Sequence, residues 1–129
     1  MMLHATALWA ALLAPVCLWL SLRVIGLRRR LRVAIGTGGQ PALERAMRAQ
    51  ANFAEYVPFA LLLLALAEAG GTPGWVLHTL GAALLAGRVA HGWGITRENE
   101  DFRFRVGGMM ATFGVIGCAA LAALVTSLT

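Results

Sequence analysis

Apolar residues dominate the chain in four long stretches, which run roughly from Ala5 to Ile25, Asn52 to Ala69, Trp75 to Ile95 and Val106 to Leu128. A helix needs about 20 mostly apolar residues to cross a bilayer. The pattern therefore predicts an all-α membrane protein, a bundle of four transmembrane helices. We expect a single domain over residues 1–129, with helices at roughly 5–32, 42–69, 74–96 and 103–128.

Glycine and proline separate these stretches. The segments Gly36–Pro41 and Gly70–Gly74 cannot sustain a helix, because glycine is conformationally loose and proline favours an extended preceding residue. Short loops are expected at both places. The segment from Met1 to Leu20 carries no Arg or Lys, unlike a cleavable signal peptide, so it is interpreted as a retained first helix.

Composition supports a membrane protein. The chain is 59% hydrophobic and 13% charged, whereas soluble domains have about 25% charged residues. All eleven basic residues are arginine, which is typical of a bacterial inner-membrane protein from a GC-rich genome. No phosphate-binding glycine loop, zinc-ligand cluster or Ser-His-Asp spacing is present, so we predict no metal, no nucleotide cofactor and no nucleic-acid partner.

The arginines cluster around two of the three connections. The first connection has Arg23, Arg28, Arg29, Arg30, Arg32, Arg45 and Arg48, and the third has Arg88, Arg97, Arg103 and Arg105. Because positive residues favour the cytoplasmic side, these connections should be cytoplasmic and both termini should lie on the non-cytoplasmic side. Attraction to anionic membrane lipids accounts for Arg30 and Arg32.

One face of the second helix is polar. Arg45, Arg48, Asn52 and Glu55 follow helical spacing and continue into an apolar run. Ionisable groups at membrane depth must pair or line a wet cavity. One interpretation is a polar lock, in which Arg48 pairs with Glu55 between helices and Asn52 bonds across; the other is a ligand pocket.

The segment from Glu44 to Pro58, with the pattern Glu-Arg-x-x-Arg-Ala-Gln-x-Asn-x-x-Glu-Tyr-x-Pro, resembles the signature of the MAPEG superfamily, and especially its leukotriene C synthase and microsomal glutathione transferase branch. The arginine-rich stretch from Val24 to Val33 and the segment from Gly87 to His91 are also similar to that family. The resemblance implies a homotrimer, with glutathione bound in a cytoplasm-facing pocket between neighbouring protomers.

The resemblance also implies roles for single residues. Arg48 would take a carboxylate of glutathione and Glu55 its amino group, with Asn52 and Tyr56 beside them. An arginine at the start of the fourth helix stabilises the thiolate in the family, and Arg105 matches it best, with Arg103 as the alternative. The remaining matches are Arg28 and Arg29, which would contact glutathione or the second substrate, and Gln50 and His91 as weaker candidates, His91 being equally interpretable as a helix-packing residue.

The chain departs from the family in its tyrosines. Family members with defined eicosanoid chemistry have tyrosines on the third helix and near the fourth, but Tyr56 is the only tyrosine here and Ile95 takes one such place. The mixed loop from Arg97 to Arg103 is expected to be a solvated turn, or alternatively to pair with the first-loop arginines of a neighbour.

Three functions are therefore weighed. The first is a glutathione transferase or peroxidase that acts on lipophilic electrophiles or lipid hydroperoxides. The second is a catalytically silent membrane binding or scaffold protein, which would bind glutathione without turnover. The third is a small transporter or channel subunit, which the loop arginines and the lack of an inverted repeat disfavour.

Overall fold

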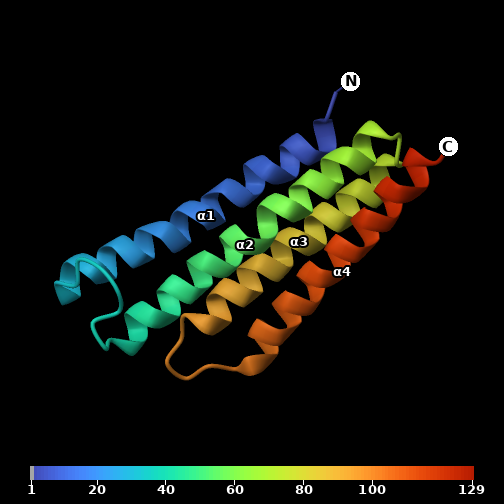
Figure 1. Ribbon diagram of the computed structural model, residues 1–129. Coiled ribbons are helices and arrows are strands. Elements are labelled where there is room, and N and C mark those ends of the chain that lie inside the picture. Colours follow the sequence, from blue (N-terminus) through green and yellow to red (C-terminus); the bar gives the residue numbers. More distant parts are fainter. Residues whose placement is uncertain (1) are drawn as a thin grey trace.

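The computed structural model describes residues 2–129 and contains four helices in this range, connected by short loops. They are α1 (His4–Leu31), α2 (Pro41–Ala69), α3 (Gly74–Ile95) and α4 (Phe102–Ser127). Each begins and ends within one residue of the range expected from the apolar pattern. The helices run alternately up and down beside one another, so that both termini lie at the same end of the bundle (Figure 1).

The loop between α1 and α2 depends on residues that tolerate a left-handed backbone. Arg32 follows α1 with φ of 56°, and its N–H donates to the carbonyl of Arg28. Gly36, Gly38 and Gly39 also have positive φ, which costs glycine little. Pro41 then begins α2, where a missing N–H is tolerated.

Glycines let α3 and α4 approach closely. A Cβ atom added to Gly87 would lie 3.0 Å from the carbonyl oxygen of Gly108, and one added to Gly94 would lie 2.9 Å from Cβ of Phe104. These glycines therefore bring the backbones of α3 and α4 into close contact within one protomer. Helix α1 packs on α2 and α3, and within the described residues it makes no close backbone contact with α4.

A carboxylate at the end of α2 caps the start of α1. The two oxygens of Glu68 accept hydrogen bonds from the backbone N–H groups of Ala5 and Thr6, each at 2.8 Å. The first N–H groups of a helix have no partner within the helix, and the helix dipole favours negative charge there. Glu68 therefore fixes the register of α1 against α2.

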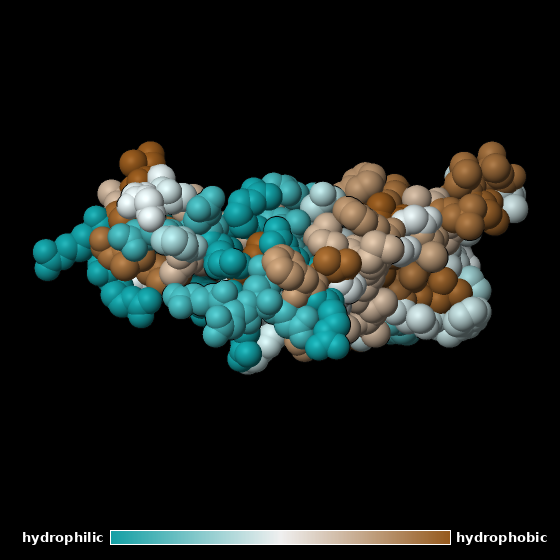
Figure 2. Space-filling model, turned by 90° about the horizontal axis from the view of Figure 1, so that it is seen from below, coloured by the Kyte–Doolittle hydropathy of each residue, from teal (hydrophilic) through white to brown (hydrophobic). Residues whose placement is uncertain are grey.

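Three of the four helices have the length and hydropathy of a membrane span, namely α1, α2 and α4. Helix α3 falls short, because its 22 residues include Arg88, two histidines and several glycines. The expected set of four spans is thus confirmed for three helices. Figure 2 shows hydrophilic residues gathered toward the end that carries the first and third connections, and hydrophobic residues toward the other.

Candidate functional site

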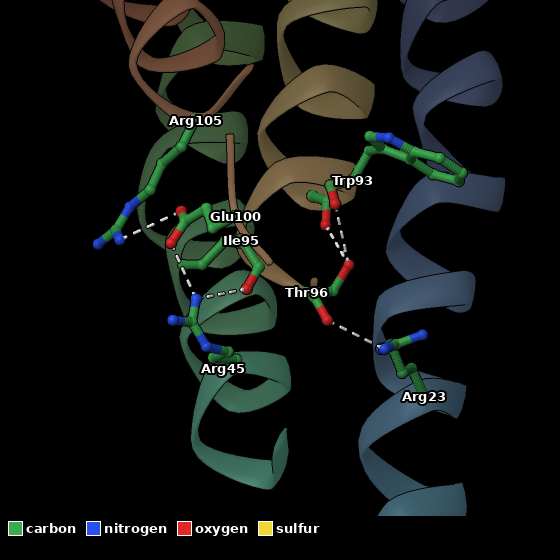
Figure 3. A network of polar contacts seen from close by, with 8 residues as sticks. Arg23, Arg45, Trp93, Ile95, Thr96, Glu100 and Arg105 are labelled. Atoms are coloured by element: carbon green, nitrogen blue, oxygen red, sulfur yellow. Dashed lines mark hydrogen bonds and ion pairs between the residues drawn. The ribbon is translucent and has the colours of Figure 1, made fainter. Parts of the chain in front are cut away.

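The polar end of the bundle is organised by one acidic residue, Glu100, in the loop between α3 and α4. Its carboxylate lies 2.8 Å from Nη1 of Arg45 on α2 and 3.4 Å from Nη1 of Arg105 on α4 (Figure 3). Arg45 also donates to the backbone carbonyl of Ile95 at the end of α3. Glu100 therefore joins three helices at this end.

The surroundings of Glu100 correct one expectation. Only 3% of its side chain is exposed, so the loop is not simply a solvated turn at this position, and both of its arginine partners lie in the same chain. Burial by itself would raise the pKa of Glu100. The hydrogen bond from Arg45 and the charge and hydrogen bond of Arg105 outweigh this effect, so the pKa lies below its ordinary value.

Beside Glu100, a groove of about 280 Å³ opens between α2 and the start of α4. It is lined by Arg45 and Arg48 from α2, by Arg105 from α4 and by Ile95 from the end of α3. Two of the arginines expected to contact glutathione, Arg48 and Arg105, thus come from different helices to one cavity. Ile95, which the family resemblance places at the position of a tyrosine, contributes an aliphatic side chain to the groove.

The rest of the polar face of α2 continues from this groove. Nη1 of Arg48 lies 3.8 Å from the carboxylate of Glu55, and both side chains are about half exposed, at 57% and 50%. This pair joins residues of one helix, so it does not form a lock between helices. Tyr56 packs edge-on against Phe113 of α4, with ring centroids 5.4 Å apart.

Arg88 has a role that the sequence did not reveal. Its place in the sequence suggests a residue of the third connection, but its side chain is fully buried inside the bundle. Its guanidinium donates to Oδ1 of Asn52 at 2.6 Å and to Oγ1 of Thr112 at 3.3 Å. No carboxylate lies within ion-pair distance of it in residues 2–129. Asn52 therefore does bond across to another helix, as the lock interpretation supposed.

His91, one turn after Arg88, is a packing residue in this protomer. It is 2% exposed, and its Nδ1 atom has no hydrogen-bond partner within the described part of the chain. A Cβ atom added to Gly108 would lie 2.7 Å from Cβ of His91, so the ring sits where α3 and α4 are closest. The structure brings His91 near Arg88 rather than into the groove.

The remaining expected residues lie on the opposite side of α2, toward α1. Gln50 donates to Oγ of Ser21 on α1 at 3.1 Å. Arg28 donates to the carbonyl oxygens of Val33 and Gly36 and so holds the first loop. Arg29 is exposed and lines a shallow groove with Arg28. The expected site residues therefore fall into two sets on different sides of one protomer.

Arg103 is separate from both sets. Its guanidinium pairs with Asp101, two residues earlier, at 2.8 Å, and 90% of the side chain is exposed. Asp101 also caps α4 by accepting from the N–H of Arg103, and these hydrogen bonds lower the pKa of Asp101. Of the two arginines considered for the thiolate, only Arg105 lines the groove.

These features define a class: a small helical-bundle membrane protein with an arginine-lined groove at one end. A family model described as the MAPEG family matches residues 6–125, and the chain belongs to that family. It is 38% identical over 123 residues to the inner membrane protein YecN of Escherichia coli strain K12, a match that covers 95% of this chain and 89% of YecN. The YecN protein of Escherichia coli strain CFT073 matches to the same extent. The relatives support a bacterial inner-membrane protein.

Proposed function

We propose that this protein is a glutathione-dependent membrane enzyme, of the transferase or peroxidase type, that acts on lipophilic electrophiles or lipid hydroperoxides. The observation that carries the proposal is the shared groove of Arg48 and Arg105. Glutathione has two carboxylates, an ammonium group and a thiol. Arg48 suits a carboxylate, and Glu55, half exposed beside it, suits the ammonium group.

The chemistry requires a thiolate, because a thiol with a pKa near about 8.5 is mostly protonated at neutral pH. Arg105 carries a permanent charge at the groove and would favour the ionised sulfur. In a transfer reaction this sulfur bonds to the electrophilic carbon, and the electron pair leaves with the displaced group. With a hydroperoxide the thiolate sulfur bonds to the terminal oxygen, the O–O bond breaks, and the alkoxide left behind takes a proton from water to become an alcohol. The sulfenic acid of glutathione then reacts with a second glutathione to give glutathione disulfide and water.

The two sets of residues support a homotrimer with shared sites. Arg48, Asn52, Glu55, Tyr56 and Arg105 face one side of a protomer, whereas Arg28, Arg29 and Gln50 lie toward α1 on another. A pocket between protomers would unite the first set of one copy with the second set of its neighbour. In this proposal α3 also spans the membrane, since its 22 residues extend about 33 Å. The arginine-rich end then faces the cytoplasm.

Two observations favour a second candidate, a membrane binding or scaffold protein without turnover. Glu100 already pairs with Arg105, so its carboxylate competes with a thiolate for the same guanidinium. Ile95, at the position where the family resemblance implies a tyrosine, gives the groove no hydrogen-bond donor from its side chain. Such a protein would bind glutathione through Arg48 and Glu55 but would not activate the thiol.

The deciding experiment compares Arg105→Ala with Arg103→Ala in the purified, detergent-solubilised protein. Conjugation of a chlorinated aromatic electrophile and reduction of a lipid hydroperoxide are measured beside glutathione binding by calorimetry. We expect Arg105→Ala to lose about 100-fold in turnover with little change in binding, because a transition-state charge loses its partner. Arg103→Ala, whose side chain is outside the groove, should retain activity.

Each other result has a defined meaning. Binding without turnover in the unmutated protein would favour the scaffold candidate. Absence of binding would show that the fold is kept without glutathione chemistry. Equal losses in Arg103→Ala and Arg105→Ala would contradict the assignment of the thiolate to Arg105.

A further inference from the structure

A second cavity, larger than the groove at Arg105, lies between α1 and α3 at the polar end. It measures about 620 Å³ and is closed on one side by the loop after α3. Arg23 crosses from α1 to donate to the carbonyl of Thr96, beside Trp93 (Figure 3). The residues that give it its character are Trp19, Arg23, Arg30, Trp93, Arg97 and Glu98.

This α1–α3 groove has an excess of positive charge, with three arginines and one acid, Glu98. None of Arg23, Arg30 and Arg97 has a carboxylate within 4.0 Å in residues 2–129. Arg97 instead stacks over the indole of Trp93, 4.0 Å from its centroid. Cations held without acidic partners around a cavity are suited to a negatively charged group.

The walls of the α1–α3 groove are aromatic and lead to an apolar surface. Trp19 and Trp93 are 36% and 47% exposed, and tryptophan prefers the boundary between lipid headgroups and hydrocarbon. From Trp93, the exposed face of α3 continues through Val89, Ala86 and Ala82 at helical spacing, away from the arginines. A ligand here would meet cations at one end and an apolar stripe at the other.

We infer that the α1–α3 groove binds an anionic phospholipid, with the phosphate at Arg23, Arg30 and Arg97 and an acyl chain along the stripe on α3. Charge complementarity and continuity with the apolar stripe together select a membrane lipid as the occupant. The site is separate from the groove at Arg48 and Arg105, so it does not depend on glutathione chemistry. It also gives Arg30 a specific role. General attraction to an anionic membrane would not require Arg30 to line a cavity, as it does here.

The test uses the fluorescence of the two tryptophans in the groove. The full chain with Trp9→Phe and Trp75→Phe is placed in phosphatidylcholine nanodiscs, and a small fraction of acyl-brominated phosphatidylglycerol or brominated phosphatidylcholine is added as quencher. We expect stronger quenching by phosphatidylglycerol. Arg30→Gln with Arg97→Gln should reduce this preference roughly tenfold or more, since each arginine near a lipid surface contributes to anionic binding.

The matched control is Arg32→Gln with Arg103→Gln, which removes the same charge from the same end but outside the groove. It should keep the preference; an equal loss would overturn the site in favour of diffuse attraction. Displacement of the brominated lipid by millimolar glycerol 3-phosphate would overturn the lipid assignment in favour of a soluble phosphate ester. If quenching falls as more protomers are loaded per nanodisc, the lipid assignment is overturned, and a second copy of the chain is the occupant of the groove.

Discussion

Arg88 is the residue whose role is hardest to deduce from the sequence alone. It lies seven residues before the end of α3, which is about 10 Å from the polar end, and its neighbours in sequence are apolar. Counted with nearby arginines, it looks like part of a positive loop. The usable signal was its depth, because an arginine inside an apolar helix must have a partner within the protein. Which partner could not be predicted, since Asn52 is 36 residues away.

Replacing Arg88 by leucine should separate stability from binding. A buried guanidinium without an acidic partner is costly, so Arg88→Leu is expected to leave the thermal midpoint unchanged or higher. Asn52 would lose the group that fixes its amide, and glutathione affinity should fall about tenfold. Calorimetry and thermal unfolding in detergent measure the two effects. The control is Arg97→Leu, which replaces an exposed arginine just after the same helix. If Arg88→Leu does not fold, Arg88 is needed for the structure itself.

The helices and their bounds were predictable because their causes are local. Apolar runs of sufficient length, Pro41 at a helix start and glycines after helix ends all act within a few residues. The connection between α3 and α4 was not predictable in the same way. Glu100 reads as a solvated acid in a charged loop, and its burial depends on Arg45, which is 55 residues away. The packing of α2 against α4 decides where it lies.

The α3–α4 connection should respond to acid. The pKa of Glu100 is lower in the folded protein than its ordinary 4.5, so its contribution to stability is present above pH 4.5 and is lost as the pH falls below that value. Near neutral pH, Glu100→Gln should be less stable by about 1–3 kcal/mol, because Arg45 and Arg105 lose a buried, charged acceptor. The difference between the thermal midpoints of the two proteins should shrink as the pH falls from about 6 to about 3.

Glu98→Gln is the matched control for this measurement, because Glu98 is exposed in the same loop and has no ion-pair partner in the described part of the chain. Its thermal midpoint should follow that of the unmutated protein at every pH. A gap between Glu100→Gln and the unmutated protein that persists in acid would contradict an electrostatic role for Glu100.

For the whole molecule, the main consequence of the fold is that one protomer presents the expected glutathione residues on two sides. Gln50 and Arg48 are two positions apart on α2 and therefore point in nearly opposite directions. No rearrangement of side chains within the protomer would bring them together. A site that uses both requires a second copy of the chain, as the proposed trimer supplies.

Mixing two inactive variants should therefore restore activity. Arg105→Ala damages the first set and Arg29→Ala the second, so a mixed trimer contains some sites built from two intact halves. Coexpression at equal levels should recover about a quarter of the unmutated turnover, as random assembly of a cyclic trimer predicts. Coexpression of Arg105→Ala with Arg48→Ala, both in the first set, should recover none. Activity no higher than that of either variant alone would place each site within one protomer.

The cap provided by Glu68 has a consequence for biosynthesis. The chain is made from its N-terminus, so α1 leaves the ribosome before residue 68 has been added, and the N–H groups of Ala5 and Thr6 then lack the acceptor that they have in the finished protein. Their hydrogen bonds to Glu68 form only after nearly all of α2 has been synthesised. The N-terminal cap of the first helix is thus completed only by the end of the second.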